Sequence, residues 1–547
     1  MHNSFSNWFS AVCFAVLLAC IPSLDAAPAN DSDRPNVIFI IVDDQDRNQF
    51  GFLSPDTAMT PNIDRLANEG TYFPNGFATS TVCTPSRYTC LTGRYPSQAS
   101  SMNAARNQTP EGLRVVGFNT YVEVDRPNIP NVLQKAGYKT GLVGKWHVGG
   151  NGYREEVPPR GSDPADPEVA AMLLRNQENL VKALKGFGFD YAANLYAGNA
   201  MDSRALKNTG MIEHNMEWIT KGALDFIDRY HAEPFYLFFS TTLPHSPDPV
   251  KSLKSDPRIS AAGLLTESID VQPSRDSVLK RVKDAGLPMS AAESLWVDDG
   301  IGAILDRLDH YGISENTLIL FFNDHGMEFG SKSTLYDGAV RTPIMAYWPG
   351  TIKAQVAEAV VSSVDFAPTI FQATDVTPPA NMDLRGVSFL DVAEGTAKRT
   401  SREFAYSELG YTRALTGADW KYLSFRLPDS AAMSTEESMK IQKKYLNDVK
   451  SKHAWVKWEP DPGAKIPHTG GPPGGDFLTR LTFQEKGPFL HNYYDPDQLY
   501  HLSEDPLESN NLASNPEYTR QLTRMQDELS NALNTLPGTF ADLKPKE

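Results

Sequence analysis

Four short apolar segments, each followed within a few residues by reactive polar side chains, constrain the fold of this chain most strongly. They lie at residues 36–42, 138–143, 235–239 and 317–322. The first, third and fourth are almost continuously apolar, which is typical of strands buried on both faces of a parallel sheet. The second is mixed in character. We therefore expect a parallel sheet that helices cover on both sides.

Segments with the apolar spacing of helices lie among these strands. They cover residues 61–69, 129–136, 212–230 and 291–311. Strands that alternate with helices predict an α/β fold. Ligand sites in open α/β sheets lie at the carboxyl ends of strands. We therefore expect the polar residues that follow the four apolar segments to form one shared site.

The composition changes after about residue 394. The later segments are a polar linker, three strand-like pieces, a loop rich in Gly and Pro, and a last helix, at residues 395–403, 404–407, 411–415, 420–425, 460–475 and 517–533. This pattern predicts a second, smaller α+β domain. The predicted boundaries are 34–395 for the large α/β domain and 403–547 for the smaller one.

The amino-terminal region predicts export. An apolar run at 11–21 is followed by Pro22 and small residues, which is typical of a secretory signal peptide, here assigned to residues 1–26. A second interpretation is a lipoprotein signal with Cys20 as the lipidated residue. No apolar run reaches the about 18 residues of a membrane-spanning helix, so we predict no transmembrane segment. Periplasm, external medium and, in a eukaryote, the lysosome all remain open.

The charge balance excludes two classes of partner. The 547 residues include 51 Lys and Arg against 67 Asp and Glu, a formal net charge of −16. Nucleic-acid binding needs basic surface, so we expect no nucleic-acid partner. Attachment to anionic lipid is disfavoured for the same reason.

The segment CTPSRYTCLTGR at residues 83–94 has a distinct local chemistry. Pro85 suits the first turn of a helix, with Thr84 or Cys83 as its cap. The helix amino terminus and Arg87 would favour an anionic group near Cys83, although a capped helix with a surface Arg is an equally good interpretation. On one helix Cys83 and Cys90 would lie roughly 10 Å apart. That exceeds the limit of about 7 Å for a disulfide, so we predict none.

This segment resembles the signature of type I sulfatases, a family of the alkaline phosphatase superfamily. Further family counterparts are Asp43 with Asp44, GKWH at 144–147, PH at 244–245, DHG at 324–326, Lys332 with YDG at 336–338, RTPIMAYWPG at 341–350, and LYHLSEDPLESNNLA at 499–513. The resemblance implies a large, mostly parallel central sheet sandwiched by helices, as in alkaline phosphatase. It also implies a smaller carboxyl-terminal domain with an antiparallel sheet.

The resemblance further implies a formylglycine and one divalent cation. Cys83 would be oxidised after translation to this aldehyde by a formylglycine-generating enzyme, and its hydrate would attack the sulfur of a sulfate ester. The implied metal ligands are Asp43, Asp44, Cys83, Asp324 and His325. Carboxylate oxygens suit Ca²⁺, whereas imidazole is an uncommon Ca²⁺ ligand, so Mg²⁺ is the alternative.

The remaining catalytic roles come from the same resemblance. Arg87 would steady the formylglycine hydrate, and Lys145 and Lys332 would bind sulfate oxygens. His147 would act as the base that releases sulfate, and His245 as the proton donor to the leaving alcohol.

The expected substrate is a sulfated carbohydrate, because export suggests an external polymer. Residues 453–475, with Trp455, Trp458, Lys465 and His468, form a candidate substrate loop, although an ordinary packed loop is the favoured interpretation. Two other functions stay open. One is hydrolysis of phosphodiesters or phosphonate monoesters by a member of the same superfamily, and the other is glycan binding without catalysis.

Overall fold

A computed structural model describes residues 34–149, 152–328, 331–452, 460, 492–540 and 542–543. The expected signal peptide at 1–26, Cys20 and nearly all of the candidate substrate loop at 453–475 lie outside these residues. Among the described helices, none combines the length and the apolar character needed to cross a bilayer.

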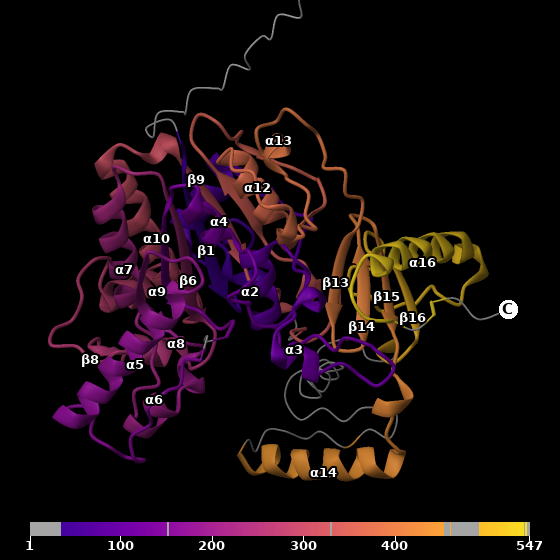
Figure 1. Ribbon diagram of the computed structural model, residues 1–547, viewed down its shortest axis with the longest axis horizontal. Coiled ribbons are helices and arrows are strands. Elements are labelled where there is room, and N and C mark those ends of the chain that lie inside the picture. Colours follow the sequence, from indigo (N-terminus) through magenta and orange to yellow (C-terminus); the bar gives the residue numbers. More distant parts are fainter. Residues whose placement is uncertain are drawn as a thin grey trace, which may run out of the picture.

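A mixed, mostly parallel sheet of eight strands forms the centre of the larger part of the molecule (Figure 1). Its strands, in spatial order, are β11 (Gln355–Val356), β2 (Thr71–Phe73), β10 (Ile344–Tyr347), β9 (Thr317–Asn323), β1 (Asn36–Asp43), β6 (Phe235–Pro244), β4 (Lys139–Lys145) and β5 (Tyr191–Tyr196). Only β10 pairs antiparallel with its neighbours, β2 and β9. The four predicted segments are β1, β4, β6 and β9, and they are adjacent in the sheet.

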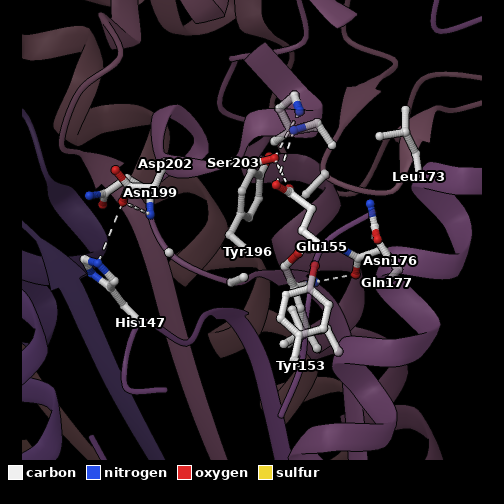
Figure 2. Close-up of a pocket in the computed structure, with 17 residues that line it drawn as sticks. His147, Tyr153, Glu155, Leu173, Asn176, Gln177, Tyr196, Asn199, Asp202 and Ser203 are labelled. Carbon is white, nitrogen blue, oxygen red and sulfur yellow. Dashed lines mark hydrogen bonds and ion pairs between the residues drawn. The ribbon is translucent and has the colours of Figure 1, made fainter. Parts of the chain in front are cut away.

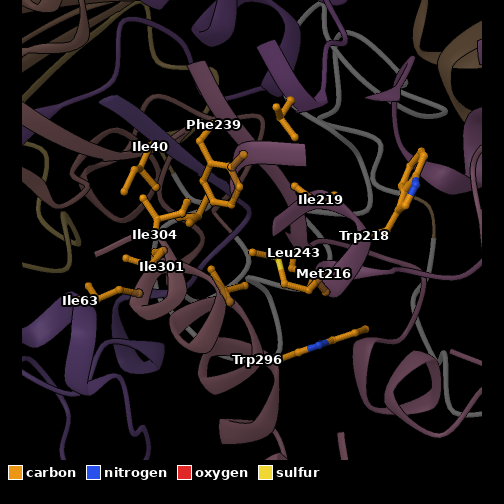
Figure 3. Packing of buried hydrophobic residues seen from close by; sticks show 14 of the residues in the cluster. Ile40, Ile63, Met216, Trp218, Ile219, Phe239, Leu243, Trp296, Ile301 and Ile304 are labelled. Carbon is orange, nitrogen blue, oxygen red and sulfur yellow. The ribbon is translucent and has the colours of Figure 1, made fainter. Parts of the chain in front are cut away.

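Helices cover both faces of this sheet. The helices used below are α1 (Pro61–Glu69), α2 (Cys83–Thr92), α4 (Ile129–Lys135), α5 (Pro167–Lys185), α6 (Arg204–Thr209), α7 (Met216–Tyr230), α9 (Arg275–Asp284), α10 (Ala291–Tyr311), α11 (Asp337–Val340) and α12 (Phe366–Ala373). Ile38 and Ile40 of β1 belong to a core with α1, α7 and α10. Figure 3 shows Ile40 within this core. Val37 and Phe39 point the other way, into a core with α2, α4 and α12. This alternation explains why β1 is apolar at every position: each face of the strand is buried.

The predicted helices are largely confirmed. Helices α1 and α10 match their predicted bounds. Helix α7 begins later than predicted, because the Asn215 side chain accepts from the Trp218 amide and caps it there. Helix α2 begins at Cys83 itself, so Cys83 or Thr84 as its cap was wrong; Val82 precedes the helix and gives no side-chain cap.

The carboxyl-terminal part contains a separate antiparallel sheet beside the larger part (Figure 1). Its strands are β13 (Ala405–Leu409), β14 (Thr412–Thr416), β15 (Trp420–Phe425) and β16 (Asp497–His501), and α16 (Thr519–Asn534) packs on it. Helix α14 (Thr435–Lys452) and strand β16 were not predicted. The predicted fold class is confirmed, whereas the exact domain boundaries stay a prediction.

Candidate active site

The carboxyl ends of β1, β4, β6 and β9 bring the predicted site residues together. Asp43 ends β1 and is fully buried, and Asp44 follows with φ = +61°, in the left-handed region. Non-glycine residues rarely adopt this conformation, and it costs on the order of 1–3 kcal/mol. The Asp44 amide donates to Asp324 Oδ1 at 3.1 Å, which joins the ends of β1 and β9.

Helix α2 places Cys83 at this junction. Cys83 is 1% exposed, and its Sγ lies 3.9 Å from His325 Nε2 and 3.8 Å from Lys332 Nζ. The Ser86 hydroxyl donates to the Asp324 carbonyl at 2.5 Å and ties the first turn of α2 to the end of β9. Cys83 and Cys90 are both free thiols, as predicted.

Four of the five predicted metal ligands form one cluster. One side-chain ligand atom from each of Asp44, Cys83, Asp324 and His325 lies within 4.8 Å of the others. Asp43 is not in this group. Its Oδ2 accepts from Lys145 at 2.5 Å and its Oδ1 lies 3.3 Å from Arg87 Nη2.

Arg87 crosses the base of the site. Its Nη1 donates to Ser240 Oγ at 2.5 Å, and its Nε lies 3.4 Å from Asp324 Oδ2. Asp43 Oδ1 and Asp324 Oδ2 are buried and lie beside this guanidinium, yet neither accepts a hydrogen bond of good geometry from a described residue. These two buried oxygens therefore retain capacity to bind a cation.

The buried charges shift the titration of the cluster. Burial raises the pKa of Asp43, but the neighbouring charges of Lys145, Arg87 and His245 together hold this pKa below its usual value. Burial also raises the pKa of the Cys83 thiol, yet Lys145 and Lys332 hold it well below its usual range. In contrast, burial and the nearby Cys83 raise the pKa of Asp324 well above its usual value.

His325 is oriented by its own loop. Its Nδ1 lies 3.0 Å from the Gly326 carbonyl, and its Nε2 lies 3.1 Å from Asp44 Oδ1. Burial lowers the pKa of His325, but Asp324 and Asp44 raise it well above the usual value. A Cβ on Gly326 would lie 2.3 Å from the Gly338 carbonyl oxygen, so this close approach requires glycine.

Lys332 and His245 both contact Asp44. Lys332 Nζ donates to the two oxygens of this carboxylate at 2.7 and 2.6 Å, and His245 Nε2 lies 3.3 Å from Oδ2. Burial lowers the pKa of His245, but Asp43, Asp44 and Cys83 together raise this pKa above its usual value. His214 contacts the backbone of the His245 segment: its Nε2 lies 2.8 Å from the His245 carbonyl oxygen.

Lys145 and His147 extend from the end of β4. A Cβ on Gly144 would lie 1.9 Å from the Ser240 carbonyl oxygen, so this glycine allows β4 and β6 to approach. His147 has φ = +57°, and its Nε2 lies 3.7 Å from Asp202 Oδ2. Burial and the charge on Lys145 lower the pKa of His147, which favours the neutral imidazole.

Several site residues were not predicted from the sequence. Asn199 Oδ1 accepts from Lys145 Nζ at 2.5 Å, and Ser240 links Arg87 to the Lys145 carbonyl. Asn199 and Asp202 follow β5, a strand that the sequence analysis did not identify. Ser240 directly follows the apolar segment 235–239, and this position at the end of a predicted strand could have identified it as a site residue.

Two cavities adjoin these residues. One, of about 530 Å³, is lined by residues including Thr84, Phe118, Tyr121 and His147. The other, of about 310 Å³, lies beyond His147 between the end of β5, α5 and α6 (Figure 2). Its wall combines leucines with Tyr153, Asp202 and Glu155, so it suits a group with both apolar and polar faces.

Comparison with known proteins gives consistent results. Residues 35–376 match the family model described as sulfatase. N-acetylgalactosamine-6-sulfatase of Rattus norvegicus is 27% identical over 411 residues, covering 69% of this chain and 68% of its own length. The ulvan-active sulfatase of Formosa agariphila is 24% identical, covering 98% of this chain and 82% of its own length.

Solved structures share the fold. A Bacteroides thetaiotaomicron protein described in work on glycosaminoglycan metabolism has a TM-score of 0.59 at 20% identity, over 92% of this chain and 99% of its own. A phosphonate monoester hydrolase from Silicibacter pomeroyi has a TM-score of 0.54 at 17% identity, over 93% and 100%.

Proposed function

The chain belongs to the sulfatase family, whose members hydrolyse sulfate esters, and we propose that its catalytic centre is built around Cys83 and acts on sulfated carbohydrates. One observation carries this proposal: Asp44, Cys83, Asp324 and His325 converge at the carboxyl ends of neighbouring strands. A shared catalytic centre explains this convergence of residues that lie far apart in the sequence.

The donor set fits a divalent cation. Asp44, Asp324 and His325 offer oxygen and nitrogen ligands at the cluster, and Asp43 supplies a further buried carboxylate beside it. The buried oxygens of Asp43 and Asp324 that lack a well-formed hydrogen bond support this assignment. We propose Ca²⁺, with Mg²⁺ as the alternative, because carboxylates dominate the set. The cation would supply positive charge that stabilises an anionic nucleophile and the sulfate oxygens.

Position 83 also fits the formylglycine that the family implies. Residue 83 begins a helix amino terminus next to Lys145 and Lys332, where negative charge is stabilised. The aldehyde would supply, as its hydrate, the oxygen nucleophile for attack on sulfur. A formylglycine-generating enzyme is the maturation partner that this assignment requires.

The surrounding side chains divide the work. Arg87, held by Ser240, would fix the position of residue 83 and offset the charge of Asp43 and Asp324. Lys145 and Lys332 would bind sulfate oxygens through their ammonium groups. His245 would hold the proton for the leaving alcohol, and neutral His147 would accept a proton during sulfate release.

The pockets support a carbohydrate leaving group. The cavity of about 530 Å³ is lined by His147 and by Thr84, the residue after Cys83, and it carries the aromatic side chains Phe118, Tyr121 and Tyr153. Flat aromatic faces suit the apolar faces of sugar rings. The relatives named for N-acetylgalactosamine-6-sulfate and ulvan act on sulfated sugars, which supports the same class here. We further propose export of the mature chain, with residues 1–26 as the signal.

Two experiments test the proposal. Mass spectrometry of the tryptic peptide 66–87 from the native host should find residue 83 as formylglycine; recovery of cysteine alone would contradict the assignment. Turnover of 4-nitrophenyl sulfate should exceed turnover of bis(4-nitrophenyl) phosphate and of a phosphonate monoester. This comparison matters because the phosphonate monoester hydrolase fold is also similar. Preference for a phosphorus ester would favour that alternative, and absence of turnover on these esters and on a panel of sulfated oligosaccharides would favour a glycan-binding role.

A further inference from the structure

A buried ion pair lies in the carboxyl-terminal part, away from the catalytic cluster. Lys421 Nζ, on β15, is 2.9 Å from Glu508 Oε1, which belongs to the chain after β16. The two side chains are 0% and 1% exposed. Burying two charges costs free energy that their attraction often fails to recover, so a buried pair is weak evidence for a purely stabilising role. We therefore ask whether the Lys421–Glu508 pair holds another part of the molecule in place.

The backbone at Glu508 supports this view. Its φ is +53°, which places a glutamate in the left-handed region at a cost of roughly 1–2 kcal/mol. Asn, Asp and His tolerate this conformation better than most residues do. Among the described residues, Glu508 and Ser333, the neighbour of Lys332, are the positive-φ positions that are neither glycine nor one of these three types. Such strain persists only where the surrounding structure enforces it.

The second carboxylate oxygen of Glu508 leaves the carboxyl-terminal sheet. Oε2 accepts a hydrogen bond from the Asp337 amide at 2.6 Å. Asp337 is the first residue of α11, and its own side chain accepts from Arg341 Nε at 2.6 Å. Glu508 thus joins Lys421 in the smaller sheet to the start of a helix in the larger part.

Helix α11 in turn holds the loop that carries His325. The Ala339 carbonyl accepts from the Gly326 amide at 2.7 Å, and Gly326 approaches α11 so closely that no side chain fits. The Gly326 carbonyl is the group that faces His325 Nδ1. A continuous path of hydrogen bonds and backbone therefore runs from Glu508 through α11 to His325.

The segment between Lys332 and α11 is held by the carboxyl-terminal sheet and by the chain before Cys83. The Tyr336 hydroxyl donates to Gln498 Oε1 on β16 at 3.0 Å. The Thr334 carbonyl accepts from Thr81 Oγ1 at 2.6 Å, two residues before Cys83. The carboxyl-terminal sheet and the chain before Cys83 thus both hold the segment that directly follows Lys332.

We propose that Glu508 is a positioning residue for the reaction: it anchors α11, and through α11 it places His325 and Lys332 against Asp44. This inference rests on the proposed function. It assigns a catalytic consequence to a residue that has no contact with the reacting atoms. The carboxyl-terminal sheet then helps to position the catalytic residues, although it has no contact with the reacting atoms.

A matched pair of double variants tests the proposal. K421M/E508Q and K421M/E508L both remove the two charges, so neither leaves an unpaired buried ion. The E508Q side chain keeps an oxygen acceptor for the Asp337 amide, whereas the E508L side chain has none. We expect K421M/E508L to lose at least tenfold in kcat for 4-nitrophenyl sulfate with KM changed less than threefold. K421M/E508Q should stay within threefold of wild type, which is the rescue that a merely structural role would not produce.

Hydrogen exchange gives a readout that is independent of turnover. In K421M/E508L the amides of Gly326 and α11 should exchange at least tenfold faster than in K421M/E508Q, while α10 and β1 stay unchanged. Equal exchange and equal kcat in the two variants would overturn the proposal. If wild type turns over no sulfate ester, the proposed function fails, and the exchange comparison still decides the positioning role. If K421M/E508L does not fold, Glu508→Asp, which is one methylene shorter, should show the same losses.

Discussion

Lys332 Nζ donates to both carboxylate oxygens of Asp44, at 2.7 and 2.6 Å, across 288 residues of sequence. Burial lowers the pKa of this lysine, but Asp44, Cys83 and the neighbouring carboxylates together raise the pKa above its usual value, so the ammonium form persists. Two predicted site residues thus meet as a partly buried charge pair beside Cys83. The pair sets the first of four predictions.

Replacing Lys332 by Met should lower kcat for 4-nitrophenyl sulfate by about 10²-fold, because a donor to the sulfate oxygens is lost. Lys280→Met is a suitable control, since that side chain is 74% exposed on α9 and lies outside the site. Steady-state kinetics on both variants provides the measurement. A Lys332→Met enzyme with wild-type kcat would remove this residue from the mechanism.

Cys83 and Cys90 offer a second matched comparison, because both are buried thiols on α2. Cys83→Ala should reduce sulfatase activity to the uncatalysed background, since position 83 supplies the nucleophile. Cys90→Ala should keep most activity, because Cys90 packs in the hydrophobic core and burial raises its thiol pKa. Equal loss in the two variants would indicate damage to α2 instead of loss of a nucleophile.

Removal of the cation should lower both activity and stability. A chelator is expected to abolish turnover and to lower the melting temperature, because an ion that binds only the folded state stabilises it. Added Ca²⁺ should restore both. Asp324→Asn should remove the chelator effect on melting, whereas His325→Asn, which keeps an oxygen ligand, should retain part of it. Melting curves that ignore the chelator in wild type would argue against a bound ion.

Ionisation of the buried Asp298 should make the free energy of unfolding depend on pH, independently of catalysis. It is buried on α10, accepts from the Ile63 amide at 2.8 Å, and burial raises its pKa from 3.8 to about 7. The folded state therefore binds this proton more tightly than the unfolded state does. The corresponding stability is present below about pH 4 and is lost as pH rises through about 7, a change of up to roughly 4 kcal/mol.

Urea unfolding between pH 4 and 8 measures this effect. The free energy of unfolding of wild type should fall across that range more steeply than that of Asp298→Asn, which cannot ionise. Asp375→Asn, in an exposed turn after α12, is the control and should keep the wild-type slope. Identical slopes for wild type and Asp298→Asn would show that Asp298 does not titrate in this range.

The sequence predicted the central strands and much of the site because burial on both faces makes β1, β6 and β9 apolar throughout. The polar residues after such strands necessarily lie at one edge of a parallel sheet. Strand β5 was not predicted, because four of its six residues are only partly buried and the segment is not continuously apolar. Asn199 and Asp202, which follow it, were missed for that reason.

Contacts between residues far apart in the chain could not be predicted from the sequence. Glu508 lies within the recognised segment 499–513, but nothing in the sequence indicates that Lys421 is its partner or that Asp337 is its target. His214 was likewise hidden at the start of a predicted helix. In the structure α7 begins at Met216, so His214 precedes the helix, and its side chain contacts the His245 carbonyl.

The hydrogen bond between Asp44 and Asp324 joins residues that leave the ribosome 280 positions apart. At about 5–20 residues per second, that separation corresponds to roughly 14 to 56 seconds of translation. Cys83 is made within this interval, before β9 and before His325, whose Nε2 lies 3.9 Å from the Cys83 Sγ in the folded protein, where the thiol is only 1% exposed. If residue 83 becomes formylglycine as proposed, a maturation enzyme would reach this thiol most readily before β9 joins the sheet.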